Sequence, residues 1–217
     1  MTRLPCEGRN KTRLIPSLGA AGAAQFHDRL ARHTIRHASE FCAANGTVKL
    51  VIWLAGGSPE EGRQWLGNHY LKEQKAGDLG VRIASAVECA FAEGAQRVVV
   101  IGTDCPELDG RGLEAAFAAL DDFPLVFGPA CDGGYYLVGL RERCPAIFEN
   151  IGWGGASVLA ESLAAAQSSG ASACLLEMLP DVDTPEDLAA AEIALSQRLG
   201  INQGLDQSHL RTDTPQP

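Results

Sequence analysis

The sequence predicts a single α/β domain in which helices cover a parallel or mostly parallel β-sheet. Short apolar runs rich in β-branched residues alternate along the chain with longer Ala/Leu-rich segments, which is the order expected when helices connect the strands of one sheet. The 217 residues, 46% hydrophobic and 21% charged, amount to about one globular domain. We therefore expect one domain over residues 1–199 and a disordered tail over residues 200–217, where the periodicity ends.

Strands are expected where apolar and β-branched residues run together. The first strand, over Met1–Leu4, is expected to be truncated, because a loop rich in Pro, Gly and cations begins directly after it. The later apolar runs are longer, and the strands expected from them are Val48–Ala55, Arg97–Gly102, Leu125–Gly128, Tyr135–Leu140 and Ala173–Leu179.

Helices are expected in the Ala/Leu-rich segments, two of which begin with a capping residue. Asp78 can cap one helix, and Thr184 can cap another that has Pro185 at its first helical position. The expected helices are Ser17–Ala44, Asp78–Ala92, Gly112–Leu120, Ser157–Gln167 and Pro185–Leu199.

Composition excludes several classes of protein. A formal net charge of −9 argues against sequence-independent binding of nucleic acid, which needs basic residues to neutralise phosphates. No apolar run approaches the roughly 20 residues of a membrane-spanning helix, and the first residues lack the apolar core of a secretory signal. Seven scattered cysteines without a C-x-x-C pair fit reduced thiols and not a disulfide framework or a zinc site. A cytoplasmic protein is expected.

The charge is unevenly distributed along the chain. Residues 1–75 hold eleven Lys/Arg against six Asp/Glu, whereas residues 76–217 hold seven against twenty-one. Two halves of opposite sign could meet across one cleft, the basic half holding phosphate and the acidic half a metal ion. Chance asymmetry on a solvated surface is the alternative.

The first candidate site is the loop of residues 5–14, which places Lys11 and Arg13 just before a long helix. Cations and turn amides at such a position favour a polyanion such as a nucleotide diphosphate. Basic loops are also common at helix starts without any ligand, so this loop is a weak signal alone.

Two acidic strings form the second candidate. Asp104 follows the strand Arg97–Gly102, and a carboxylate at the carboxyl end of a buried strand faces the crevice where α/β sheets bind ligands. Asp183 lies just before the last helix and could complete a two-carboxylate site for Mg²⁺. Each could instead be only a helix cap.

Two glycine-containing segments are the third candidate. Asp132-Gly133-Gly134 lies between two expected strands, where the glycines allow close backbone approach and Asp132 could act as a base, although Asp-Gly is also an ordinary hairpin signal. Residues 74–82, with Gly77, Gly80 and Arg82, open a helix that Asp78 can cap, and could instead pack against a base and its phosphates.

Other reactive side chains are weaker candidates. His33 and His37 are spaced for a helical metal pair, but neighbouring arginines would repel a cation. Cys105 and Cys131 adjoin the acidic strings and are expected to be packed thiols, since nothing nearby would lower their pKa.

In order, the strings KTRL, GDLGxR, GTDCPEL, GPACDGGYYLVGL and DVDTPEDL resemble one family, the rSAM/selenodomain-associated transferase 1 group of nucleotide-diphospho-sugar transferases. The likeness spans residues 5 to about 190 and extends more distantly to phospholactate and molybdenum-cofactor guanylyltransferases. It implies a Rossmann-like GT-A fold that binds an NTP or NDP-sugar with Mg²⁺ or Mn²⁺. The chain departs from the family in its short first strand and in Trp153-Gly154-Gly155, where the family has Trp-Ser-Thr.

The resemblance implies a role for each matching residue. It makes Asp104 and Asp183 metal ligands and Asp104, Asp132 and Lys11 catalytic. The substrate-binding residues that it implies are Lys11, Arg13, Gly77, Leu79, Gly80, Arg82, Gly133, Gly134 and Trp153.

The function expected from this is a metal-dependent transfer of a sugar from an NDP-sugar to a small-molecule acceptor. A nucleotidyltransferase that releases pyrophosphate is the alternative, and a catalytically impaired nucleotide-binding protein is another. Expected partners are the donor, the acceptor and a second copy of the chain in a homodimer; nucleic acid and membranes are not expected.

Overall fold

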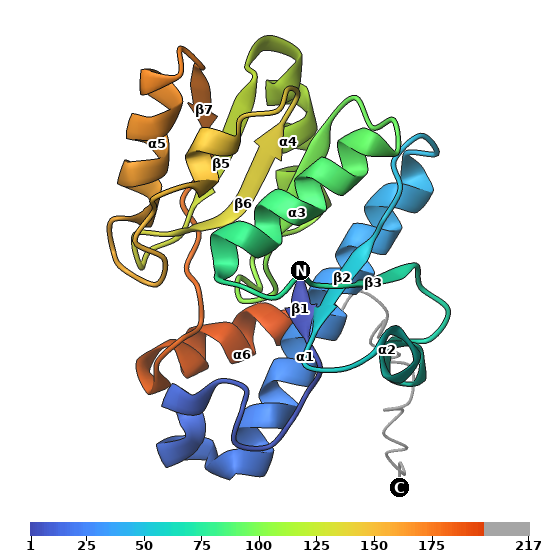
Figure 1. Cartoon of the computed structure of the whole chain (residues 1–217). Coiled ribbons are helices and arrows are strands. Elements are labelled where there is room, and N and C mark those ends of the chain that lie inside the picture. The colour runs from blue at the N-terminus through green and yellow to red at the C-terminus, as the bar shows by residue number, and fades with distance from the viewer. Residues whose placement is uncertain (198–217) are drawn as a thin grey trace, which may run out of the picture.

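The strands form two small sheets that lie side by side (Figure 1). The structure is a computed structural model that describes residues 1–197, so the expected tail lies outside the described residues. One sheet has the order β1-β2-β3 and is parallel throughout, with β1 Thr2–Arg3, β2 Ile52–Ala55 and β3 Leu71–Glu73. The other has the order β4-β6-β5-β7, with β4 Val98–Ile101, β5 Leu125–Pro129, β6 Tyr135–Leu140 and β7 Ala173–Leu175.

The second sheet is mixed. Strand β6 runs antiparallel to both β4 and β5, whereas β5 and β7 are parallel. The two sheets meet at the amino end of the chain, where the main-chain nitrogen of Met1 donates a hydrogen bond of 2.6 Å to Ile101 O of β4. Because β1 contains only two residues, its ladder ends before it can pair further with β4, and the sheet is divided there.

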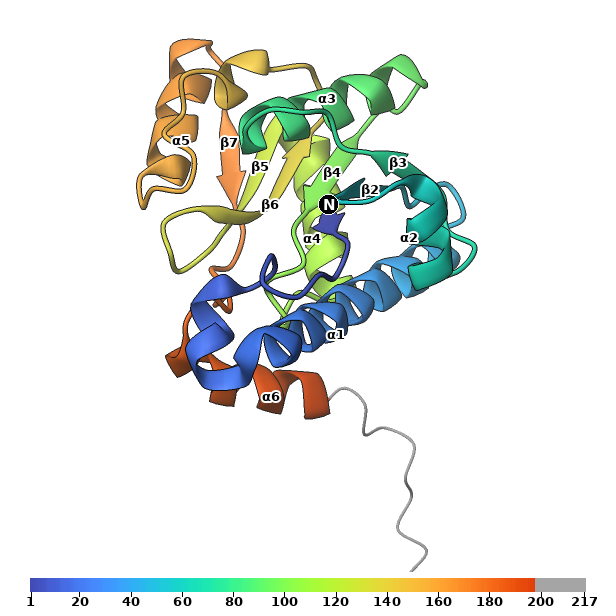
Figure 2. The same cartoon turned by 60° about the horizontal axis from the view of Figure 1, so that its bottom comes forward.

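Helices cover both faces of the second sheet (Figures 1 and 2). The helices are α1 Ile15–Ala44, α2 Pro59–Leu66, α3 Leu79–Ala92, α4 Gly110–Asp122, α5 Val158–Ser168 and α6 Leu188–Gln197, with 3₁₀ turns at Thr12–Leu14, Pro145–Phe148 and Pro185–Asp187.

The helices pack on the sheet through small and apolar side chains. α3 and α5 contact one face through Ile83, Val87 and Ala166. α1 and α4 contact the other face through Ala38, Leu113, Ala116 and Leu120. α6 packs against the first part of α1.

These elements confirm the predicted α/β class and most of its order. Two elements were not predicted. α2 begins at Pro59, directly after the N-cap Ser58, which forms a capping box with Glu61, a signal present in the sequence. β3 has the sequence Leu-Lys-Glu, without a β-branched residue, and no local signal marks it. No helix within residues 1–197 is long and apolar enough to cross a membrane.

Candidate functional site

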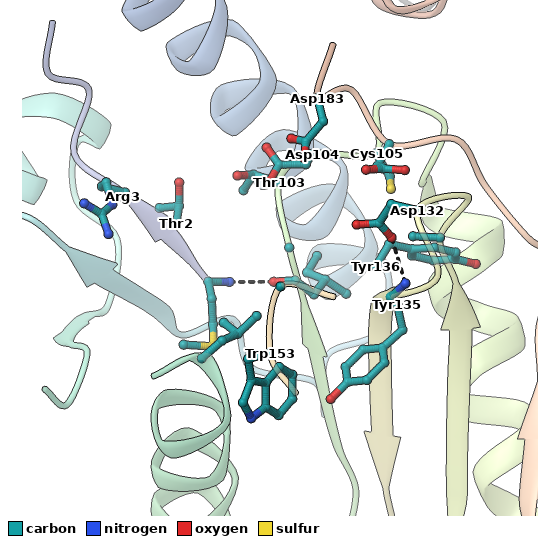
Figure 3. A pocket seen from close by; sticks show the side chains of 18 of the residues that line it. Thr2, Arg3, Thr103, Asp104, Cys105, Asp132, Tyr135, Tyr136, Trp153 and Asp183 are labelled. Carbon is teal, nitrogen blue, oxygen red and sulfur yellow. Dashed lines mark hydrogen bonds between the residues drawn. The ribbon is translucent and has the colours of Figure 1, made fainter. Parts of the chain in front are cut away.

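A cavity of about 630 Å³ opens between the two sheets, above the carboxyl ends of β1 and β4 (Figure 3). Open α/β sheets bind ligands at such a position, because loops that follow neighbouring strands converge there. Basic residues of the amino-terminal segment and acidic residues of the later segments line it together. The charged residues that line the cavity are Arg3, Arg9, Lys11, Arg13, Arg82, Asp104, Asp132, Asp181 and Asp183.

Lys11 lies at the centre of this charge distribution. Its side chain is 6% exposed, and its ammonium lies 2.7 Å from Asp104 Oδ1 and 3.2 Å from Asp183 Oδ1. It also donates a hydrogen bond of 2.5 Å to Val182 O, so all three of its donors are used. Burial acts to lower the pKa of Lys11, but the carboxylates of Asp104 and Asp183 outweigh it and the pKa is raised. The ammonium is therefore permanently charged and joins two carboxylates that are far apart in the sequence.

The backbone at Lys11 is strained. Its φ of 46° and ψ of 48° lie in the left-handed region, which a residue with a Cβ rarely adopts. The loop holds it there, since Asn10, itself buried, accepts a hydrogen bond from Cys6 N. Such strain persists where the surrounding structure fixes it, and it is concentrated at functional sites.

Asp104 and Asp183, the two expected metal ligands, thus approach the same cation, but that cation is the Lys11 ammonium. A different set of carboxylates lies close enough to share a metal ion. Asp132, Asp181 and Asp183 offer oxygens that all lie within 4.8 Å of one another. Asp181 was not among the expected site residues, although it belongs to the same acidic string as Asp183.

The electrostatics of Asp181 reflect this crowding. Its pKa is raised, first by partial burial and then by the negative charge of Asp132, with Asp183 adding to the effect. A site that leaves like charges so close favours a bound proton or a cation. Carboxylate oxygens are the ligands that Mg²⁺ and Mn²⁺ prefer, so the residues present fit a divalent cation.

Arginines around the cavity keep unused donors. Arg13 gives one bond of 3.0 Å to Asp183, and its side chain is 70% exposed. Within the described part of the chain, Arg82 uses only its Nε, which donates to Gly77 O at 2.9 Å. Arg3 and Arg9 line the cavity, and no ion pair is found for either among residues 1–197. Because the donors of Lys11 are filled, these arginines are the groups available to an anion.

The hairpin between β5 and β6 places Asp132 at the cavity. Asp132 Oδ1 accepts a hydrogen bond of 2.7 Å from Gly134 N, which closes the turn and leaves Oδ2 for other contacts. Gly133, at φ 89°, packs so closely that a Cβ would lie 2.0 Å from Ala156 O. The glycines therefore shape the turn. Gly134 borders the cavity, and Gly133 lies behind it.

The residues at the start of α3 also divide into those that line the cavity and glycines that pack or position their neighbours. Leu79 and Arg82 line the cavity together with Trp153. Gly80 does not line it, and a Cβ there would lie 2.3 Å from the Trp153 indole nitrogen. Gly77 is also outside the lining and instead accepts the bond from Arg82. The structure thus gives both glycines a role in packing and positioning.

Two of the weaker candidates, His33 and Cys105, take up structural positions, whereas Cys131 is exposed and the expectation that it is a packed thiol is wrong. His33, buried, lies with Nε2 3.0 Å from Pro106 O, and its ring contacts that of His37. Cys105 lines the cavity but is buried, and burial together with the nearby carboxylates raises the pKa of its thiol. A thiol held protonated is a poor nucleophile, as expected for a packed cysteine.

A family described as uncharacterized proteins conserved in bacteria (DUF2064) matches residues 38–155. No curated protein matches the sequence. Among solved structures, a protein of Desulfovibrio desulfuricans G20, provisionally called a nucleotide-diphospho-sugar transferase, is 27% identical with a TM-score of 0.79; the match covers 90% of this chain and 94% of that one. This likeness confirms the predicted fold.

Two more distant structures share the fold alone. A 4-diphosphocytidyl-2C-methyl-D-erythritol synthase of Anaerococcus prevotii DSM 20548 is 8% identical with a TM-score of 0.58, over 77% of this chain and 89% of that one. A CMP:2-keto-3-deoxy-manno-octonic acid synthetase in complex with CTP is 15% identical with a TM-score of 0.50, over 76% of this chain and 88% of that one.

Proposed function

Because the chain belongs to the DUF2064 family and has the fold of nucleotide-utilising transferases, we propose that it is a glycosyltransferase that moves a sugar from an NDP-sugar to a small-molecule acceptor. Within the family, its five motifs favour the rSAM/selenodomain-associated transferase 1 group. One observation carries the proposal: a carboxylate cluster and a set of arginines line one cavity at the carboxyl ends of the strands.

The donor diphosphate is assigned to the basic side of the cavity. Arg13, Arg82 and Arg9 have unused donors there, and guanidinium groups bind phosphate oxygens in pairs. Lys11, together with Arg13 at Asp183, offsets the charges of Asp104 and Asp183, which would otherwise repel the diphosphate. It would contact a phosphate only by giving up one of its three acceptors.

The carboxylates divide into two proposed roles. Asp181 and Asp183, with Asp104 beside them, would hold Mg²⁺ or Mn²⁺, which when bound would offset the charge of the diphosphate. Asp132, on the hairpin, is the proposed base for the acceptor. As its carboxylate takes the hydroxyl proton, the acceptor oxygen bonds to the sugar carbon, the bond from that carbon to the diphosphate breaks, and NDP leaves.

Product analysis tests this proposal. The protein is incubated with Mg²⁺, a panel of NDP-sugars and NTPs, and a panel of hydroxyl-bearing acceptors, and the released nucleotide or pyrophosphate is separated by anion exchange. Release of NDP with a glycosylated acceptor is expected. Release of pyrophosphate would replace the proposal with nucleotidyl transfer, and nucleotide binding without turnover would indicate an impaired binding protein.

Asp104→Asn should lower the rate on the order of 10²-fold or more, the usual cost of removing a charge that stabilises the transition state. The matched control is Asp122→Asn, at an exposed position at the end of α4, which should leave the rate unchanged. Equal rates for the two variants would contradict the role of Asp104.

A further inference from the structure

Gln74 is a polar residue of the cavity lining that takes no part in the proposed reaction. Gln74 follows β3 directly, and its main-chain nitrogen donates to Leu54 O at 2.8 Å, which extends the parallel ladder. Its side chain reaches across β2 to β1. There Nε2 donates hydrogen bonds of 2.9 Å to Trp53 O and of 2.9 Å to Thr2 O.

These two bonds fix the orientation of the amide. Carbonyl oxygens only accept hydrogen bonds, so the NH₂ group must face both of them, and the reversed amide would set oxygen against oxygen. Both N–H donors of Gln74 are then used. No residue among 1–197 donates a hydrogen bond to its Oε1, and the side chain lines the cavity. Gln74, a residue of the cavity lining, therefore keeps a fixed acceptor that none of the described residues uses.

The Gln74 amide is bonded to Thr2 O of β1, and Arg3 of the same strand also lines the cavity (Figure 3). A phosphate has no N–H group to offer to an amide oxygen. The part of a nucleotide that offers one is the base, since each of the four common bases has an N–H group on its pairing edge. An arginine of the cavity lining can donate to the ring nitrogen or carbonyl oxygen beside that group.

We propose that Gln74 Oε1 accepts a hydrogen bond from an N–H group of the nucleobase and so helps select the nucleotide, an inference that rests on the proposed function. Its two bonds to main-chain carbonyls hold it rigid for this task. A preorganised acceptor loses little freedom when it binds, and it penalises a base that leaves it unpaired.

The test is a binding cycle that changes the protein and the ligand separately. Affinities are measured by calorimetry with Mg²⁺ for ADP, CDP, GDP and UDP, and for analogues in which a base N–H group is deleted or methylated. Inorganic tripolyphosphate serves as a ligand without a base. The proteins are the wild type, Gln74→Met and the matched control Gln64→Met, an exposed position in α2.

In the wild type and in Gln64→Met, the preferred nucleotide should bind about tenfold more tightly than its analogue, the scale of one hydrogen bond to a fixed partner. In Gln74→Met that ratio should fall to about one, while tripolyphosphate binds all three proteins alike. A general loss of stability in a variant affects its affinities for the nucleotide and for the analogue alike, so it leaves their ratio unchanged. Melting temperatures would show such a loss.

Two results would overturn the assignment while leaving the proposed function in place. These are an unchanged ratio in Gln74→Met and no difference between parent and analogue in the wild type for any base. If the wild type binds neither nucleotides nor tripolyphosphate, the proposed function itself fails. The wild-type comparison decides the matter even if Gln74→Met does not fold.

Discussion

At the scale of single residues, the site is organised around one buried ammonium. Lys11 joins Asp104, from the loop after β4, to Asp183, from the segment before α6. The sequence marked all three residues through their motifs. It could not show that Lys11 pairs with both carboxylates, because both lie far from Lys11 along the chain, Asp183 by 172 positions, and the pairing depends on how these segments meet in space.

Lys11→Met tests this organisation. Removing the ammonium leaves two partly buried carboxylates without their shared partner, so the free energy of unfolding should fall by about 1–3 kcal/mol. Urea unfolding at pH 7 measures the change. Lys49→Met, which removes an exposed lysine, is the control and should unfold at nearly the wild-type urea concentration. An unchanged midpoint for Lys11→Met would show that the ammonium contributes nothing to the fold.

The raised pKa of Asp181 predicts a pH dependence. The folded protein binds this proton more tightly than the unfolded chain does, so the contribution of Asp181 to stability decreases as pH rises from the ordinary range of a carboxyl group through the raised pKa. Asp181→Asn removes the penalty. The variant should be more stable than the wild type at pH 7 and lose that advantage near pH 3–4.

Denaturant unfolding at both pH values checks the sign of the effect. Added Mg²⁺ should reverse the order at pH 7, since the cation stabilises the wild type through the carboxylate that the variant lacks. A variant less stable than the wild type at pH 7 without Mg²⁺ would contradict the repulsion among the three carboxylates.

At the scale of elements, the hydrophobic pattern predicted most strands and helices, and the cavity lies at the strand ends that the sequence singled out. The start of α3 shows why: the Asp78 side chain accepts from Val81 N at 2.9 Å, the cap that its sequence indicates. The three residues of β3 gave no such signal. β3 is a strand because of its neighbour β2 in the sheet, which a local pattern does not contain.

The same limit applies to the glycines at α3. The GDLGxR string was expected to contact the nucleotide, but the structure puts Gly80 against the Trp153 indole, a contact between distant segments. Asp181 was missed for a related reason: its importance comes from its distance to Asp132, on another loop.

Gly80→Ala tests the contact between α3 and Trp153. The added methyl group has no room beside the indole, so one element must shift, and overpacking of this kind costs about 1–3 kcal/mol of unfolding free energy. Trp153 and Leu79 line the cavity, so nucleotide affinity should fall as well. Chemical denaturation and nucleotide titration measure the two effects.

The control is Gly110→Ala, at the first turn of α4, where nothing lies within 4 Å of the new Cβ. It should leave stability unchanged or raise it by about 0.4–1 kcal/mol. Equal stability of the two alanine variants would show that the helix start tolerates a side chain at Gly80.

At the scale of the whole molecule, the cavity accounts for the uneven distribution of charge along the chain. The basic amino-terminal segment and the acidic later segments meet at one cavity, where Lys11 and Arg13 form ion pairs with carboxylates of the later segments. The cavity also lies where the two sheets are joined through Met1 and Ile101. A nucleotide bound there would touch both sheets and strengthen a junction that has few backbone hydrogen bonds.

A saturating nucleotide with Mg²⁺ should therefore raise the melting temperature of the protein as one cooperative unit. At a ligand concentration about 100 times its dissociation constant, the gain is about 2.7 kcal/mol. Differential scanning calorimetry should then show one transition moving upward. Two transitions, of which only one responds to the ligand, would mean that the nucleotide binds one sheet without bridging to the other.

The central claim is that the carboxylates of this cavity hold a divalent cation beside a bound nucleotide. Its most direct measurement is the binding of Mn²⁺, followed by the paramagnetic resonance of the free ion, with and without a nucleoside diphosphate. The wild type should bind one Mn²⁺ tightly in the presence of the nucleotide, and Asp183→Asn should lose that ion while Asp122→Asn keeps it. Equal Mn²⁺ binding by all three proteins would contradict the account.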